Sequence, residues 1–207
     1  MKSLRTVFLV LGFVALLFSS KAWSYGTGIS TYPLMMDKSM LSAEFTGITS
    51  DGGGVGLQGR LTHKVSQKVV IDGGIGMAGG ERNSRIFAGA DIELYPDYMK
   101  QPRVSLKTTF ENAEEFDTRR NILGVAPTVS KGFSFWGEEA YPFISLPYKI
   151  GLNSDTQTYQ TQMSLDMGIN GSIPVDGYRH LTGTVEANID LDDSYTAIFL
   201  GVSYAIN

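Results

Sequence analysis

Hydrophobic and polar residues alternate along most of this chain, and the alternation is clearest in residues 54–78. Read in steps of two, Leu57 and Leu61 fall on one side of an extended backbone and Arg60 on the other. The pattern resumes after a short polar turn at residues 65–68. Successive side chains of a β-strand point to opposite faces, so a period of two predicts a strand. Two such strands joined by a few residues predict an antiparallel hairpin.

The same alternation continues to the end of the chain and predicts ten strands, with no helix after the N-terminal residues. The stretch 133–152 is the least regular of them. Glu138 and Glu139 break its alternation and suggest a bulge, and Pro142 and Pro147 lack the backbone N–H that a central strand donates. The expected strands fall within residues 41–47, 54–64, 69–78, 86–95, 103–111, 123–129, 133–152, 159–170, 181–190 and 197–206.

The strand pattern favours a barrel in a membrane over a soluble β-protein. Most expected strands span about 9–12 residues, the length that a tilted strand needs to cross the hydrocarbon layer. Their apolar face is unbroken, whereas the other face mixes small residues with single charges of both signs. An open edge in lipid would leave backbone groups without partners, so the sheet must close. We expect an all-β fold, a closed antiparallel up-and-down transmembrane β-barrel of ten strands, with eight or twelve as alternatives.

The first residues have the character of a secretory signal peptide. Lys2 and Arg5 precede an apolar run at residues 7–18, and Ala22 and Ser24 supply small residues at the −3 and −1 positions of a cleavage site. The run is too short to span a bilayer as a helix, so we expect cleavage near Ser24, export through the periplasm and a place in the bacterial outer membrane. The expected division of the chain is a signal peptide at residues 1–24, an irregular lead-in at 25–37 and a β-barrel domain at 38–207.

Charge and cysteine content exclude several functions. The chain has 17 basic and 21 acidic residues, and the expected signal peptide contains three of the basic ones, which leaves 14 against 21 in the mature chain. This negative balance is a poor match for nucleic acid, so we expect no nucleic-acid partner. The absence of cysteine excludes a lipoprotein attachment site, a disulfide framework and a thiolate metal site. We expect no cofactor and no metal.

Two segments resemble bacterial outer-membrane β-barrels. The last strand, residues 197–207 (AIFLGVSYAIN), resembles the closing strand of these proteins, although Tyr204 is its last aromatic residue and the family usually ends in one. Residues 133–138 (FSFWGE) resemble the strand that opens after a periplasmic turn in small barrels of the OmpA/OmpX class. The resemblance implies contact with outer-membrane lipid and lipopolysaccharide and a C-terminal strand that is read by the barrel-assembly machinery. We expect a monomer by default.

Pairing the hairpins about their turns places a belt of charged residues on the inward face. Arg60 falls between Glu44 and Asp72, and Asp91 falls between Asp72 and Lys107. An ion-pair network that fills the interior is the plainer interpretation, because a lone charge in a narrow, partly dry space is costly. The alternative is a constricted pore with this belt as its eyelet. The complete belt is Glu44, Arg60, Asp72, Asp91, Glu93, Arg103 and Lys107.

Two carboxylates, Asp166 and Glu186, are expected side by side on the inward faces of adjacent strands. Such a pair could share a proton and act as acid and base, or Arg120 or Lys149 could neutralise it. His180 and Thr182 with Glu186 faintly resemble the histidine, hydroxyl and acid sets of outer-membrane lipid hydrolases, but with threonine in place of serine. We therefore expect no catalytic site.

Several aromatic residues near the expected strand ends have the positions of membrane-interface anchors. They are Trp136, Tyr159, Tyr178, Tyr195 and Tyr204. The expected turns are short and polar, too small for an obvious receptor site. The sequence favours a structural or narrow-channel role. A surface adhesion or binding barrel, an outer-membrane lipid-modifying enzyme and a soluble periplasmic β-barrel are the alternatives.

Overall fold

Twelve β-strand segments form one antiparallel sheet in the part of the chain that the computed structural model describes. That part comprises residues 29, 31–50, 54–78, 82–115, 118–135, 137–153 and 158–206. The segments are β1 (Ser39–Ile48), β2 (Gly54–Lys64), β3 (Val69–Ala78), β4 (Arg82–Tyr95), β5 (Arg103–Glu115), β6 (Thr118–Ser130), β7 (Phe133–Phe135), β8 (Glu138–Ser145), β9 (Tyr148–Asn153), β10 (Thr158–Ser172), β11 (Leu181–Asp192) and β12 (Ala197–Ile206).

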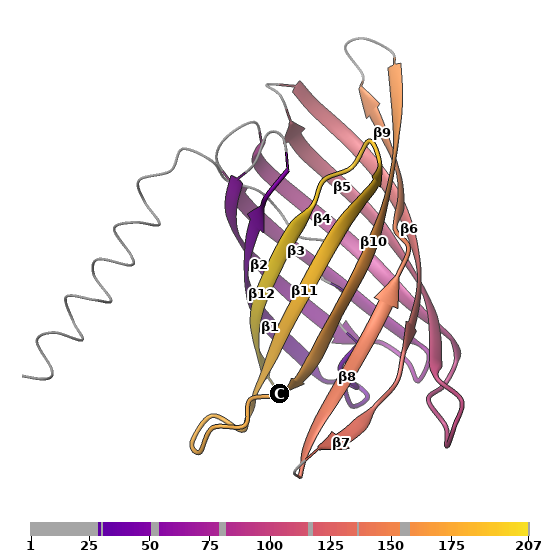
Figure 1. The fold of residues 1–207 in the computed structure, drawn as a ribbon, viewed down its shortest axis with the longest axis vertical. Helices are drawn as coiled ribbons and strands as arrows, with labels where there is room; N and C mark the ends of the chain where they lie inside the picture. Colours follow the sequence, from indigo (N-terminus) through magenta and orange to yellow (C-terminus); the bar gives the residue numbers. More distant parts are fainter. Residues whose placement is uncertain are drawn as a thin grey trace, which may run out of the picture.

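The sheet closes on itself (Figure 1). The first strand pairs with the last along its whole length, from Ser39 opposite Ile206 to Ile48 opposite Ala197. The β10–β11 pairing completes the circle. The segment β7 continues the line of β6, and β9 continues that of β8, so the barrel has ten strand positions. The predicted all-β, ten-stranded closed barrel is confirmed.

The irregular stretch of the sequence is where two of these strands are interrupted. The segment β7 pairs with the start of β8, while the rest of β8 pairs with β6. Leu146 and Pro147 then separate β8 from β9, and both of these segments lie between β6 and β10. Proline has no N–H for the ladder, which accounts for a break at this point. Pro142 by contrast stays inside β8, opposite Ile169.

The two faces of the sheet have opposite character. Leu57, with 57% of its surface exposed, is one of many large apolar side chains on the outside, whereas Arg60 on the inner face is 1% exposed. This is the reverse of a soluble protein and is the arrangement of a barrel whose outer surface meets lipid. Among the described residues, one cluster of buried apolar side chains is present, formed by Ile48, Tyr195, Ala197 and Phe199.

Both chain termini of the barrel domain lie at the same end, because β1 begins beside the last residue of β12. We call this end, which also carries the β2–β3, β4–β5, β7–β8 and β10–β11 connections, the terminus end, and the opposite one the far end (Figure 1). Within the described ranges, no helix is long and apolar enough to cross a membrane.

Candidate functional site

Arg60 is the centre of a buried ion-pair cluster in the lumen. Its guanidinium binds Glu44 with two hydrogen bonds, at 2.9 Å from Nε to Oε1 and 3.1 Å from Nη2 to Oε2. Its Nη1 donates to Oδ2 of Asp72 at 2.6 Å, and Nζ of Lys107 donates to the same oxygen at 3.0 Å. Two-pronged contacts between arginine and carboxylate are among the strongest that charged side chains form. One arginine from β2 thus joins carboxylates from β1 and β3.

A glycine allows Lys107 to reach Asp72. Lys107 lies on β5 and Asp72 on β3, with β4 between them. Gly89 of β4 is the residue opposite Asp72, and a Cβ atom there would lie 2.8 Å from Oδ1 of Asp72 and 3.5 Å from Cε of Lys107. The lysine side chain therefore passes over a strand that has no side chain in its path.

A second cluster, formed by Arg85, Glu111 and Lys149, adjoins the first. Nη2 of Arg85 lies 3.3 Å and Nζ of Lys149 3.2 Å from Oε1 of Glu111. Lys149 reaches over β6 at Gly124, where a Cβ would come within 3.2 Å of its Cγ. The Phe87 ring lies between the clusters, with the Arg60 and Arg85 guanidinium carbons 4.9 and 4.5 Å from its centre. Both contacts are within the range of a cation–π attraction.

The alternation of the sequence indicates two of the three residues of this second cluster. Arg85 is an even number of residues from Asp91 along β4, and Glu111 is an even number from Lys107 along β5. Residues separated by an even number lie on the same face of a strand, so alternation predicts that Arg85 and Glu111 face inward. Lys149 lies in the irregular stretch 133–152, where alternation could not assign a face.

The predicted charge belt divides into two groups. Arg103 binds Asp91 at 2.8 Å and Glu93 at 3.1 Å towards the terminus end. Asp91 is opposite Lys107 in the strand register, as the hairpin pairing suggested. Lys107 nevertheless binds Asp72, and Asp91 binds Arg103, because side-chain reach rather than backbone register selects the partner.

Asp166 and Glu186 both lie in the lumen with 0% of their surface exposed, on the adjacent strands β10 and β11. Oδ1 of Asp166 accepts hydrogen bonds from Oγ of Ser164 at 3.2 Å and Nδ2 of Asn188 at 2.5 Å. Oε2 of Glu186 accepts one from the backbone N–H of Ile29 at 3.1 Å. These two carboxylates thus accept hydrogen bonds from uncharged amide and hydroxyl groups.

Neither of the two cations proposed as neutralisers makes its ion pair with these acids. Lys149 pairs with Glu111, although it also interacts electrostatically with Asp166. Arg120 donates to Oε1 of Gln160 at 2.9 Å, on the exposed part of β6 and β10. Uncharged donors therefore surround the carboxylate pair, and buried cations interact with it electrostatically over a longer distance.

Part of the lead-in lies inside the barrel. Ile29 and Thr31 are buried, and Asn170 of β10 donates through Nδ2 to the carbonyl of Ile29 at 3.2 Å and to Oγ1 of Thr31 at 2.8 Å. Thr31 in turn donates to the carbonyl of Tyr141 at 3.2 Å. Tyr32 meets the Tyr141 ring edge to face, with 5.5 Å between centres. The sequence predicted this segment as irregular, but nothing in it indicated that the segment would enter the lumen.

The interior is packed. Each of the ten strand positions contributes at least one inward side chain that is no more than 9% exposed. Side chains this buried have almost no contact with bulk water. One such residue from each position, in order round the barrel from β1, is Thr46, Arg60, Asp72, Phe87, Glu111, Ile122, Lys149, Asp166, Glu186 and Phe199.

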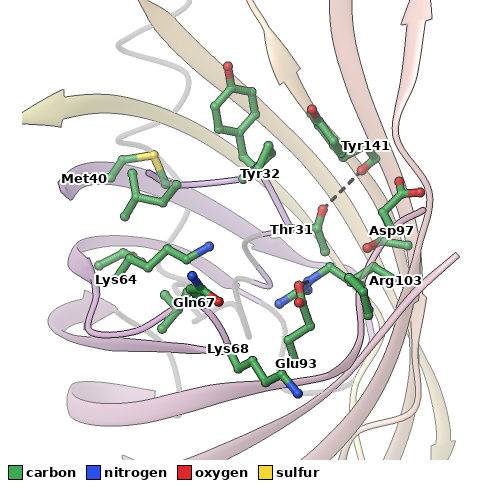
Figure 2. A pocket seen from close by; sticks show the side chains of 16 residues that line it. Thr31, Tyr32, Met40, Lys64, Gln67, Lys68, Glu93, Asp97, Arg103 and Tyr141 are labelled. Carbon is green, nitrogen blue, oxygen red and sulfur yellow. Dashed lines mark hydrogen bonds and ion pairs between the residues drawn. The ribbon is translucent and has the colours of Figure 1, made fainter. Parts of the chain in front are cut away.

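A cavity of about 220 Å³ remains at the terminus end (Figure 2). The lead-in residues 31–34 line one side of it, and the end of β2 with the β2–β3 turn lines another. Asp97, in the β4–β5 connection, binds Lys131 and accepts a hydrogen bond from the Gly132 N–H at 2.7 Å. Burial alone would raise the pKa of Asp97, but these two hydrogen bonds and the lysine charge outweigh it and lower that pKa below the ordinary value.

The predicted interface aromatics do not all lie on the outer surface. Tyr159, Tyr178 and Tyr204 are exposed on the barrel. Tyr195 is not an outward anchor, because it is 8% exposed and packs with Phe199 in the apolar cluster. Trp136 lies outside the described residues.

The structure does not assemble the faint hydrolase-like set. The exposed His180 packs against the ring of Tyr204, with 5.8 Å between centres, whereas Thr182 and Glu186 are buried in the lumen. Over the described ranges, no group of three or more His, Cys, Asp or Glu side chains is placed to hold a metal ion.

A closed antiparallel sheet with an apolar exterior and a polar interior is the construction of bacterial outer-membrane barrels. This chain has that fold. No protein-family model and no curated protein matches it. Similar solved structures include a de novo designed transmembrane β-barrel, with 14% identity and a TM-score of 0.41 over 84% of this chain and 98% of that one.

Two natural proteins are also among the similar structures. The N-terminal β-barrel domain of OprF from Pseudomonas aeruginosa has 11% identity and a TM-score of 0.35 over 83% of this chain and 98% of that one. Ail, the attachment invasion locus protein of Yersinia pestis, has 9% identity and a TM-score of 0.29 over 83% of this chain and 100% of that one. The sheet closure and the apolar exterior of this outer-membrane-type barrel define its fold independently of these likenesses.

Proposed function

We propose that this protein is an integral outer-membrane β-barrel with a structural role, whose lumen is closed in its resting state. The observation that carries the proposal is the packed interior, in which every strand position contributes a buried inward side chain. Arg60 and Glu111 each bind two partners, so the inner faces of neighbouring strands are linked by charge. Removing one partner of a buried pair is costly, so these contacts stabilise the packed arrangement of the inner side chains once it has formed.

In this proposal the protein is a monomer in the outer membrane, and the position of its termini gives its orientation. The signal peptide is removed in the periplasm, so the terminus end faces that compartment. Large apolar side chains are exposed on β2, β6, β11 and β12 alike, which supports lipid, including lipopolysaccharide, as the surrounding partner of the barrel. The last strand, paired with β1 as the closing strand, is the segment offered to the assembly machinery.

Catalysis and adhesion have less support. Asp166 and Glu186 are enclosed, and neither meets the outer face of the sheet where lipid would lie. The far-end connections comprise residues 49–53, 79–81, 116–117, 154–157 and 193–196, lengths that offer little surface to a receptor.

The proposal predicts a protein that migrates as a folded barrel and does not conduct. In outer-membrane fractions we expect a band that changes its gel mobility on heating. In planar bilayers the purified protein is expected to leave the current at the lipid baseline, because the packed interior excludes water. Recovery in the soluble periplasmic fraction would contradict the location, and stable current steps with the unaltered protein would contradict the closed lumen.

A narrow, gated channel is the second candidate, and the position of the lead-in favours it. Ile29 and Thr31 belong to no strand, so they could leave the lumen without breaking the sheet. We expect a chain that starts at residue 38 and also carries Arg60→Ala and Lys107→Ala to show small current steps, because both the segment and the central charges are removed. The same chain with both charges retained is the control. A baseline current from the altered chain, with heat-modifiable migration preserved, would rule out the channel.

A further inference from the structure

The cavity at the terminus end has a basic side. Lys64, the last residue of β2, and Lys68, in the following turn, line it together with Gln67 (Figure 2). Lys64 is half-buried, whereas Lys68 and Gln67 are exposed, so the cavity opens to solvent at this turn. The two lysines therefore flank an entrance on the periplasmic side of the proposed orientation.

These two lysines differ from the other cations of the lumen. Arg60, Arg85, Arg103, Lys107 and Lys149 each contact at least one carboxylate. No acidic side chain among the described residues lies within ion-pair distance of Lys64 or Lys68. Two lysines without a carboxylate partner at one cavity are suited to bind an anion.

A buried hydroxyl in the same wall supports this independently. Thr62 lies two residues before Lys64 on the same inward face, is 2% exposed and lines the cavity. Its Oγ1 has no hydrogen-bond partner among the described residues. A buried polar group without a partner costs free energy, and a bound ligand oxygen would satisfy it.

The acidic residues at the cavity do not oppose an anion. Glu93 is bound to Arg103, and Asp97 to Lys131. Arg103 is shared between Glu93 and Asp91, whereas Lys131 binds Asp97. With Lys64 and Lys68, four cations face these three carboxylates, which leaves one excess positive charge at the cavity. The remaining walls include the apolar atoms of Tyr32, Met40 and Val70.

We propose that this cavity binds a small soluble organic anion, with its phosphate or carboxylate group held by Lys64, Lys68 and the Thr62 hydroxyl. A short apolar body of the ligand would lie against Tyr32 and Met40. A volume of about 220 Å³ is below the range of about 300–1,000 Å³ typical of sites for drug-sized molecules, which limits the ligand to a few carbon atoms or a single ring. The lead-in forms part of the site, so an occupied cavity would also hold the lead-in in place.

Calorimetric titration of the full chain, extracted from outer membranes in nonionic detergent, tests the proposal with phenyl phosphate as the probe. We expect one saturable site, which Lys64→Gln with Lys68→Gln weakens by about tenfold or more because two charge-assisted contacts are lost. Thr62→Val, which preserves shape and both charges, is expected to weaken binding by about threefold to tenfold. Lys100→Gln with Arg179→Gln removes two charges outside the cavity and is the matched control, expected to change affinity less than about twofold.

Two further ligands identify what is recognised. Benzyl alcohol, which has a ring but no charge, is expected not to bind. Dihexanoyl phosphatidic acid tests a membrane-lipid source for the same phosphate group, and preferential binding of this lipid over phenyl phosphate would overturn a soluble ligand. The proposal also fails if phenyl phosphate shows no saturable binding, if the two double variants weaken it equally, or if Thr62→Val leaves the affinity unchanged.

Discussion

Replacement of Arg60 with methionine is expected to lower the free energy of unfolding by about 3–5 kcal/mol, the usual cost of removing one partner from a buried ion pair. Arg60 is 1% exposed and contacts Glu44 and Asp72. Asp72 keeps Lys107 after the change, whereas Glu44 keeps only the amide of Gln58 among its side-chain contacts in the described structure. Urea unfolding of the protein refolded in lipid vesicles measures the loss.

Two companion variants separate the ion pair from a general effect of losing an arginine. Arg119 is exposed and donates one hydrogen bond, to Ser84, so Arg119→Met is expected to change stability by less than about 0.5 kcal/mol. Arg60→Met with Glu44→Gln removes the unbalanced charge as well and should regain most of the loss. A loss below about 1 kcal/mol for Arg60→Met alone, as for an exposed pair, would mean that water reaches this arginine.

Leu57→Lys is expected to cost about 2–4 kcal/mol, the range measured for lysine on the lipid face of a barrel near the bilayer midplane. Leu57 is 57% exposed and lies opposite Phe45 and Met77 in the register, away from the lumen. The cost arises because an ammonium group must be taken from water into hydrocarbon. Urea unfolding in vesicles and the yield of folded protein in outer membranes both report it.

The matched control for this variant is Gln67→Lys, which adds the same charge in the turn of the same hairpin. Gln67 is exposed at the terminus end, so the charge remains in water and a change below about 0.5 kcal/mol is expected. Equal tolerance of the two lysines would show that the Leu57 face meets water, and the transmembrane assignment would then be wrong.

The alternation of residues predicted the barrel and the two faces of its strands because side-chain direction in a strand depends only on residue parity. Leu57 and Arg60 were assigned to opposite faces on this basis, and the structure exposes the first and buries the second. Parity could not assign faces in residues 133–152, because Pro147 lies in a break between two strand segments. Across such a break, the register of the strands must be known before a face can be assigned. Tyr195 was misplaced because it lies in a connection, outside any alternating run.

Ion-pair partners could not be read from the hairpin pairing alone. Lys107 binds Asp72 two strands away, and Lys149 binds Glu111 two strands away. In both cases a glycine of the intervening strand, Gly89 or Gly124, leaves room for the lysine side chain. The partner of a long side chain thus depends on which neighbours lack a Cβ atom on the inner face, which becomes visible only when the strands are assembled.

The sequence by itself determined the strands, the apolar outer face and the inward position of Arg60, because these follow from local alternation. Only the tertiary structure decided which groups meet inside the barrel. The pairing of charges across strands, the entry of Ile29 and Thr31 into the barrel and the cavity beside Lys64 all depend on distances between segments far apart in the sequence. Such distances are set by closure of the sheet, and no local pattern encodes them.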